Sequence, residues 1–244
     1  MAGITVNELD EITEVPSDSY LVVDNGTETN KVSKENLLKQ TKTQENIENF
    51  KKFVITTQSG EEDWAPAINQ CLSTHNSVYI PYNITISSPI ELSSGQQLKG
   101  FSKNTIIKAN TDFSGSAMIK LKDDSVVLCI IKDICLNGNA SNQGSNTFKG
   151  ISLEGNTDNQ TQDARFDIRD IFITRVPGDA FVLTGRGESH ISHIFCRWNN
   201  GNGFVINCWD TFFDNLSSGV CKGDGYVING ANLKFVYCKK MRYR

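Results

Sequence analysis

Three stretches of the sequence repeat one another at an almost constant interval. They read GDAFVLTG at 178–185, GNGFVINC at 201–208 and GDGYVING at 223–230, so their offsets are 23 and 22 residues. Each stretch follows a pair of apolar residues three positions apart, and these pairs are Ile168 and Ile171, Ile191 and Ile194, and Phe213 and Leu216. One unit therefore consists of an apolar pair, a polar turn and a glycine that leads into an apolar segment.

Short strand-like segments at such a regular period predict a parallel β-helix, in which each coil stacks on the one before it. One coil cannot bury its inward face alone, whereas stacked coils bury continuous columns of side chains. We expect two columns, one of Ile151, Phe181, Phe204 and Tyr226 and the other of Leu153, Leu183, Ile206 and Ile228. The small residues before the first column, Gly150, Ala180, Gly203 and Gly225, indicate a bend too tight for a larger side chain. A β-sandwich or a jelly roll would not repeat residue identities at one period.

The chain divides into three regions. In residues 1–35, β-branched runs beside Asn25-Gly26 predict a small β-hairpin element. Residues 33–52 have few large apolar residues and predict one or two short helices. Residues 36–60 are expected to form a neck packed against symmetry mates or a solvated linker. Residues 61–244 are expected to begin the β-helix shaft.

The shaft is expected to open with a short helix. Asp63 to Leu72 combines an N-cap, a proline in the first turn and an apolar stripe at helical spacing. After Ser77 the apolar period changes to that of strands. Short strands are predicted at Val78–Ile80, Ile84–Ile86, Ile90–Leu92, Leu98, Ile106–Ile107, Met118–Leu121 and Val126–Ile131.

Charge and cysteine content exclude several classes of protein. The 244 residues include 24 Lys and Arg against 28 Asp and Glu, and a net charge of −4 argues against a nucleic-acid-binding protein. No apolar run approaches the length of a membrane span, and residues 1–20 lack the basic and apolar regions of a secretory signal. The seven cysteines are odd in number and form no C-x-x-C pair. We therefore expect reduced, buried thiols, with no metal site and no cofactor.

Residues 63–101 resemble the segment that opens the pectate-lyase-like β-helix superfamily. After the helix come SVYIP at 77–81, PIEL at 89–92 and QLKGF at 97–101, which are similar to the first strands of that superfamily. Bacteriophage tailspikes share this opening. In addition, SDSYLVVDNG at 17–26 and KVSKENLL at 31–38 are similar to the particle-anchoring leader of phage tail proteins.

The resemblance to phage tailspikes and tail fibres implies a homotrimer in the virion tail that is made in the host cytoplasm. Residues 1–35 would dock on tail, baseplate or adaptor proteins, and the candidates for this contact are Ile4, Val6, Leu21, Val22 and Val23. The right-handed β-helix would bind host capsular or surface polysaccharide. Because the last unit has only begun at Arg244, we expect an N-terminal portion of a longer protein, with any cleavage activity in the distal part.

No catalytic motif for polysaccharide cleavage is evident in these residues. Asp170 and His193 occupy the same position in successive units and are the candidate catalytic residues, because an imidazole beside a carboxylate can titrate near neutral pH. A solvent-facing stack is the alternative. Asp123-Asp124 is expected to be an exposed turn. Arg175-Val176-Pro177 resembles part of a pectate lyase motif but lacks its second arginine, and it aligns with the turn at Trp198.

Two further features bear on ligand binding. Trp198, Trp209 and Phe212 could stack on sugar rings or pack in a subunit interface. Polar insertions at 137–148 and 156–165 are expected to form loops on one face of the solenoid. The rival hypothesis is an intact polysaccharide lyase or glycoside hydrolase of the same superfamily, and the sequence leaves open whether the parent protein is an enzyme.

Overall fold

The computed structural model describes residues 20–24, 29–33, 45–155 and 164–241, in two units that divide after Thr43. The first unit contains an antiparallel pair, β1 (Tyr20–Asp24) and β2 (Thr29–Ser33), with Tyr20 opposite Ser33. This pair confirms the predicted hairpin element. Of the candidate anchoring residues, Leu21, Val22 and Val23 lie in β1, whereas Ile4 and Val6 lie outside the described residues.

The second unit begins with short elements around a helix. These are β3 (Glu45–Asn46), the 3-10 helix η2 (Ile47–Phe53), β4 (Ile55–Thr56), β5 (Glu62–Asp63) and α2 (Ala65–Thr74). β3 pairs in parallel with the first strand of the solenoid, and η2 packs against α2. The antiparallel pair β4–β5 forms a hairpin, which we call the entrance hairpin and define as residues 55–63.

Helix α2 confirms the predicted helix and is fixed at its start by a buried carboxylate. The Asp63 Oδ1 atom accepts hydrogen bonds from the backbone N–H of Ala65 at 3.0 Å and from that of Ser87 at 2.9 Å. It therefore satisfies a free N–H at the start of the helix and ties the helix to the first coil. The apolar stripe predicted from the sequence is buried, as Ala67, Ile68, Cys71 and Leu72 show.

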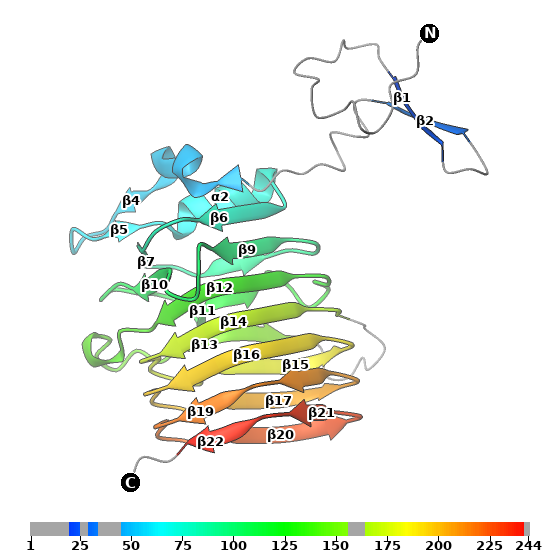
Figure 1. Cartoon of the computed structure of the whole chain (residues 1–244). Coiled ribbons are helices and arrows are strands. Elements are labelled where there is room, and N and C mark those ends of the chain that lie inside the picture. Colours follow the sequence, from blue (N-terminus) through cyan, green and yellow to red (C-terminus); the bar gives the residue numbers. More distant parts are fainter. Residues whose placement is uncertain (1–19, 25–28, 34–44, 156–163, 242–244) are drawn as a thin grey trace. The chain divides into compact units, whose positions relative to one another are not determined.

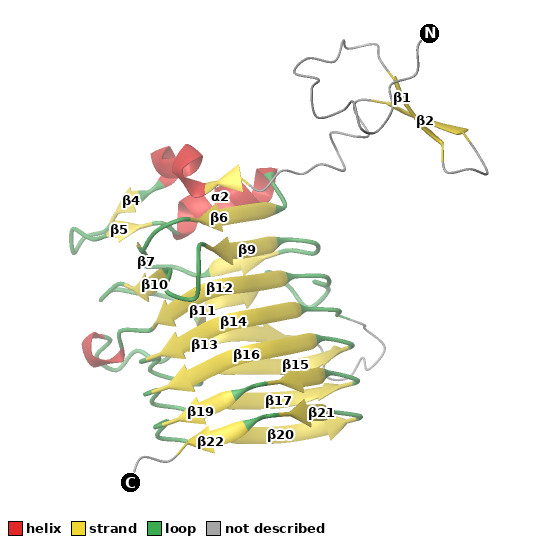
Figure 2. Ribbon diagram, viewed as in Figure 1, coloured by secondary structure: helices red, strands yellow, loops and turns green. Residues whose placement is uncertain are grey.

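The remaining strands wind into successive coils (Figures 1 and 2). They are β6 (Ser77–Ile80), β7 (Ile84–Ile86), β8 (Ile90–Leu92), β9 (Gln97–Gly100), β10 (Ile106–Ala109), β11 (Ala117–Leu121), β12 (Ile130–Asn137), β13 (Lys149–Glu154), β14 (Asp167–Thr174), β15 (Phe181–Gly187), β16 (His190–Arg197), β17 (Phe204–Trp209), β18 (Phe212–Asp214), β19 (Ser217–Gly219), β20 (Tyr226–Ala231), β21 (Lys234–Val236) and β22 (Lys239–Met241). The short 3-10 helix η3 (Ala140–Asn142) lies between β12 and β13.

Within the described ranges, one face of the solenoid is a six-stranded parallel sheet in the order β20-β17-β15-β13-β11-β8. The other strands form a twelve-stranded sheet, in which β12, β14 and β16 each run across two faces of a coil. Every strand of these faces pairs with the equivalent strand one coil away. The long parallel ladders confirm the predicted β-helix architecture.

The two predicted columns are present in the expected register. Phe181 pairs with Ile151 and Phe204, and Phe204 pairs with Tyr226, while the Leu153 column continues in the same way to Ile228. The small residues before the first column are required by packing. A Cβ atom on Gly150 would lie 2.5 Å from the carbonyl oxygen of Ala180, a distance that real Cβ atoms do not reach.

Three ladders of left-handed residues bend each coil. They consist of Leu128, Arg165, Glu188, Asp210 and Asn232; of Asp133, Asp170, His193, Asn215 and Tyr237; and of Arg175, Trp198 and Val220, all with φ between 46° and 62°. We call these the first, second and third corners. At Leu128, Trp198 and Val220 the position and not the residue type decides the conformation, because this region of φ is disfavoured for such side chains, whereas the Asp, Asn and His residues of the second corner tolerate it.

Two sequence expectations are corrected by the structure. The strand predicted at Val126–Ile131 begins only at Ile130, because Leu128 is the bend of the first corner, with φ of 62°. The insertion at 137–148 runs between β12 and β13, whereas that at 156–165, most of which lies outside the described residues, runs between β13 and β14. The first insertion therefore precedes β13 and the second follows it.

Candidate functional site

The candidate catalytic pair lies on the second corner. Strand register places Asp170 beside His193 in neighbouring coils, and both residues are left-handed. Asp170 is half-buried and His193 is exposed, and among the described residues no hydrogen bond or ion pair joins their side chains. Their catalytic role therefore stays a prediction. Close to Asp170 on the same strand, the Asp167 carboxylate forms an ion pair with the Arg169 guanidinium group at 3.3 Å.

The acidic pair at 123–124 forms an exposed turn, as expected. The hydroxyl and backbone N–H of Ser125 donate hydrogen bonds to Asp123 Oδ1, and these bonds lower the pKa of the Asp123 carboxyl group. Arg175 and Trp198 occupy the third corner together, which confirms the predicted alignment of these two turns. Trp198 is 44% exposed, whereas Trp209 and Phe212 are half-buried.

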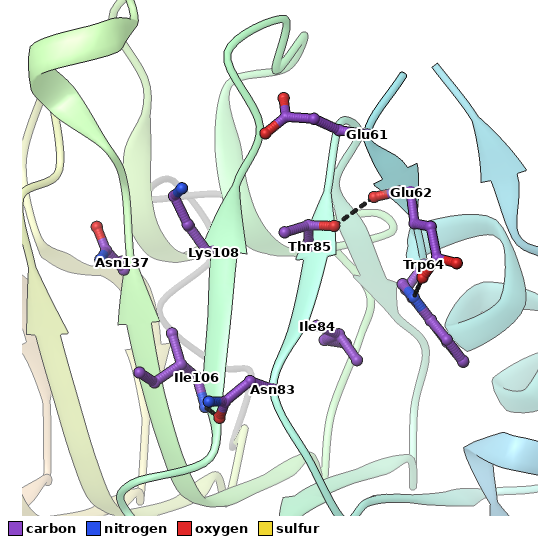
Figure 3. A pocket seen from close by; sticks show the side chains of 9 residues that line it. All are labelled: Glu61, Glu62, Trp64, Asn83, Ile84, Thr85, Ile106, Lys108 and Asn137. Atoms are coloured by element: carbon purple, nitrogen blue, oxygen red, sulfur yellow. Dashed lines mark hydrogen bonds between the residues drawn. The ribbon is translucent and has the colours of Figure 1, made fainter. Parts of the chain in front are cut away.

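A pocket that the sequence did not predict lies beside the entrance hairpin (Figure 3). Its volume is about 520 Å³, and its lining combines charged, amide, hydroxyl and apolar side chains: Glu61, Glu62, Trp64, Asn83, Ile84, Thr85, Ile106, Lys108 and Asn137. The floor is the outer face of β7, β10 and the end of β12. Figure 3 shows Thr85 between Lys108 on one side and Glu62 on the other.

Register fixes the polar floor of the pocket. Thr85 on β7 pairs with Lys108 on β10, and Lys108 pairs with Asn137 on β12, so three polar side chains cross the strands in a row. Asn83 Oδ1 accepts a hydrogen bond from the backbone N–H of Ile106 at 2.8 Å, which fixes the edge nearest the second corner. The aliphatic side chain of Ile106 lies among these polar groups.

The acidic wall is held by hydrogen bonds from the solenoid. The Thr85 hydroxyl and the Asn110 amide both donate to the carbonyl oxygen of Glu62, the latter at 3.0 Å. The Trp64 indole N–H donates to the Glu62 carboxylate at 2.9 Å. The Glu61 carboxylate accepts hydrogen bonds at 3.1 Å from both the backbone N–H and the hydroxyl of Thr111. Both carboxylates are therefore fixed as hydrogen-bond acceptors at the pocket wall.

Such a lining suits a ligand that carries hydroxyl groups and apolar carbon faces. Carboxylate and amide oxygens accept hydrogen bonds, the ammonium group of Lys108 donates them, and the side chain of Ile106 offers apolar contact. Among the described residues, no group of three or more His, Cys, Asp and Glu side chains is arranged to hold a metal ion.

The cysteines do not offer a nucleophile at this site. All seven are free, and five of them are buried. Burial raises the pKa of the Cys135 and Cys208 thiols to about 11 and holds that of Cys196 well above its usual value. Because the thiolate is the reactive form, these side chains serve the core and not a reaction. In the part of the chain that the structure describes, no helix has the length and apolar character needed to cross a membrane.

Comparison with known proteins gives structural likenesses only. No family model and no curated protein sequence matches the chain. Among solved structures, the mannuronan C-5 epimerase AlgE6 A-module of Azotobacter vinelandii is similar, with a TM-score of 0.59, 15% identity and coverage of 78% of this chain. A putative glycosyl hydrolase from Parabacteroides merdae has a TM-score of 0.57 and 12% identity over 81% of this chain. Pre-mature bacteriophage phi29 gene product 12 has a TM-score of 0.56 and 15% identity over 85% of this chain.

The chain has a parallel β-helix fold. At 12–15% identity these similarities concern the architecture alone. The chain spans 62% of the epimerase module, 96% of the putative hydrolase and 34% of gene product 12. The epimerase module and the phage protein are thus longer chains than the one described here.

The pocket escaped prediction because its wall comes from outside the repeat. Residues 55–63 precede the helix and have no repeat partner, so their sequence gives no register with β7. The local signal is the acidic pair Glu61-Glu62, which directly precedes the predicted helix cap Asp63 and the first residue of the apolar stripe, Trp64.

Proposed function

We propose that this chain is the β-helix part of a phage tail protein of the tailspike or tail-fibre type, and that it binds polysaccharide on the host surface. The pocket beside the entrance hairpin carries this proposal, because its mixed polar and apolar lining matches the chemistry of a sugar. The similarity of residues 63–101 to the opening of tailspikes and the fold shared with a phage gene product add support.

In this proposal the two parts of the chain have separate tasks. Residues 1–35 dock on tail, baseplate or adaptor proteins through Ile4, Val6, Leu21, Val22 and Val23, as the resemblance to tail-protein leaders suggests. The β-helix presents its outer faces to the glycan. Lys108 and Asn137 donate hydrogen bonds to sugar hydroxyls, and the Glu61 and Glu62 carboxylates accept them.

A glycan array probed with the full chain tests the pocket. Substitution of Lys108→Ala together with Asn137→Ala is expected to weaken binding to the glycans that the wild type retains by about tenfold or more, because a charged and a neutral donor are lost. The control is Lys222→Ala, which removes the same charge from an exposed turn. Unchanged binding by the double variant, or a wild-type chain that retains no glycan, would contradict the proposal.

The trimer inferred from the resemblance predicts a mass that light scattering can measure. The chain has a mass of 27.1 kDa, so a trimer in solution is expected at three times that value. A single-chain mass that persists across a wide range of protein concentration would refute the trimer. Such a result would not affect the proposal for the pocket, because all residues that line the pocket belong to one chain.

A further inference from the structure

A line of cations crosses the outer face of the solenoid near its N-terminal end. Lys99 on β9 pairs with Lys132 on β12, and Lys132 pairs with Arg169 on β14. Figure 1 shows these three strands one above another on the same face. Tyr79 on β6 pairs with Lys99 and completes the line. We call Tyr79, Lys99, Lys132 and Arg169 the basic column.

The cations of this column are only partly neutralised by the protein. Lys99 Nζ lies 6.0 Å from the centroid of the Tyr79 ring, and Arg169 pairs with Asp167 at 3.3 Å. Lys132 makes no ion pair with any of the described residues. Neighbouring positions of a parallel ladder are about 4.8 Å apart, so the three like charges repel one another, and such pairs destabilise a sheet.

A linear polyanion would relieve this repulsion. Its negative groups would recur along the solenoid axis at about the coil spacing of 4.8 Å, which is close to the length of one pyranose unit. We propose that the basic column binds a polysaccharide that carries carboxylate groups, such as a uronic acid polymer, laid along the axis across β9, β12 and β14. This inference rests on the proposed function only in taking the polymer to be a glycan.

The arrangement of acidic groups favours a glycan over a nucleic acid. The second corner runs beside the column and carries Asp133 and Asp170, while Asp214 continues the column itself two coils below Arg169. The cations thus form a short line flanked and ended by carboxylates, whereas a nucleic-acid site gathers Lys and Arg without such carboxylates to replace counterions along the phosphate backbone. The net charge of −4 agrees with this distinction.

The test is affinity electrophoresis of the full chain in gels that contain polygalacturonate, alginate or the neutral polymer dextran. We expect both uronate polymers to retard the wild type, and Lys132→Gln alone to weaken this binding about two- to fivefold, as for one exposed ion pair. The triple variant Lys99→Gln, Lys132→Gln and Arg169→Gln should weaken it by at least about tenfold. Lys222→Gln, in an exposed turn, is the charge-matched control and should bind like the wild type.

The other outcomes separate this inference from the proposed function. Retardation by dextran but not by the uronate polymers would overturn the acidic class and leave polysaccharide binding intact. No retardation by any of the polymers would count against both. If oligodeoxythymidine competes as well as polygalacturonate and the triple variant loses both, the column is a general anion site and the glycan assignment is wrong. Circular dichroism of each variant checks that the fold is retained.

Discussion

Replacement of Arg186 by alanine is expected to lower the free energy of unfolding by about 2–5 kcal/mol, because it leaves a cavity in place of a large buried side chain and removes a charged hydrogen-bond donor. The Arg186 side chain is fully buried, although its residue type is rarely found inside a protein. Its guanidinium group donates a hydrogen bond to the carbonyl oxygen of Asp124, in the turn between β11 and β12. Burial lowers the pKa of Arg186, while the nearby Asp124 and Asp123 act in the opposite direction.

The surrounding backbone is shaped to admit this side chain. A Cβ atom on Gly155 would lie 2.2 Å from Arg186 Nε, so the glycine provides the space in which the arginine passes. The ladder between β15 and β17 is irregular between Thr184 and Gly187, which is where Arg186 lies. Arg186 therefore links the six-stranded sheet to the turn at 122–125.

Urea-induced unfolding followed by tryptophan fluorescence measures this effect. Arg165→Ala is the matched control, because the side chain of Arg165 is 62% exposed in its ion pair with Glu188, and its removal should cost less than about 1 kcal/mol. Arg186→Met keeps most of the volume and removes the charge. An unchanged unfolding midpoint in Arg186→Ala would show that the buried contact does not contribute to stability, whereas full stability in Arg186→Met would assign the role to packing alone.

Phe204→Ala is expected to destabilise the protein by a similar amount, about 3–5 kcal/mol, the usual cost of removing a buried aromatic ring. Phe204 is fully buried in the inward column, with ring centroids 5.9 Å from Phe181 and 5.0 Å from Tyr226. Stacked coils cannot close readily around the missing ring, because each neighbour is held by its own parallel ladder. The cavity therefore persists and adds to the lost burial.

The chain offers a control of the same residue type eight positions later. Phe212 occupies an outward position, where it lies between His190 and Lys234 in the same column. Its ring is half-buried, so Phe212→Ala should cost clearly less than Phe204→Ala in the same urea titration. Equal losses in the two variants would contradict the division into inward and outward columns.

The repeat predicted the inward side of the solenoid because burial constrains it in every coil. Ile151, Phe181 and Phe204 must stack on like residues, so their spacing in the sequence is the spacing of the coils. The need for a small residue at Gly150 followed from the same logic and matches the contacts there. The apolar stripe of helix α2 could be predicted for the same reason, because its residues are buried.

The corners and the pocket could not be predicted in the same way. The left-handed corners hold Leu128, Trp198 and Val220, which have no local preference for positive φ and take it only because the adjacent strands require it. The pocket depends on where the entrance hairpin meets β7, a contact between segments with no shared pattern. The candidate pair Asp170 and His193 was found because it lies on a repeated position, although repetition there reflects a bend.

The register between coils also has a consequence for how such a molecule can change over evolutionary time. Ile168, Ile191 and Phe213 occupy equivalent positions, and each is the register partner of the next one in the parallel ladder. Duplication or loss of one such unit in the gene would lengthen or shorten the shaft by one coil and leave every inward column continuous. The outward columns would also stay continuous, and only the number of coils would change. If the basic column binds a polymer as proposed, the length of polymer that it spans would change in whole coils, without any change to the interior.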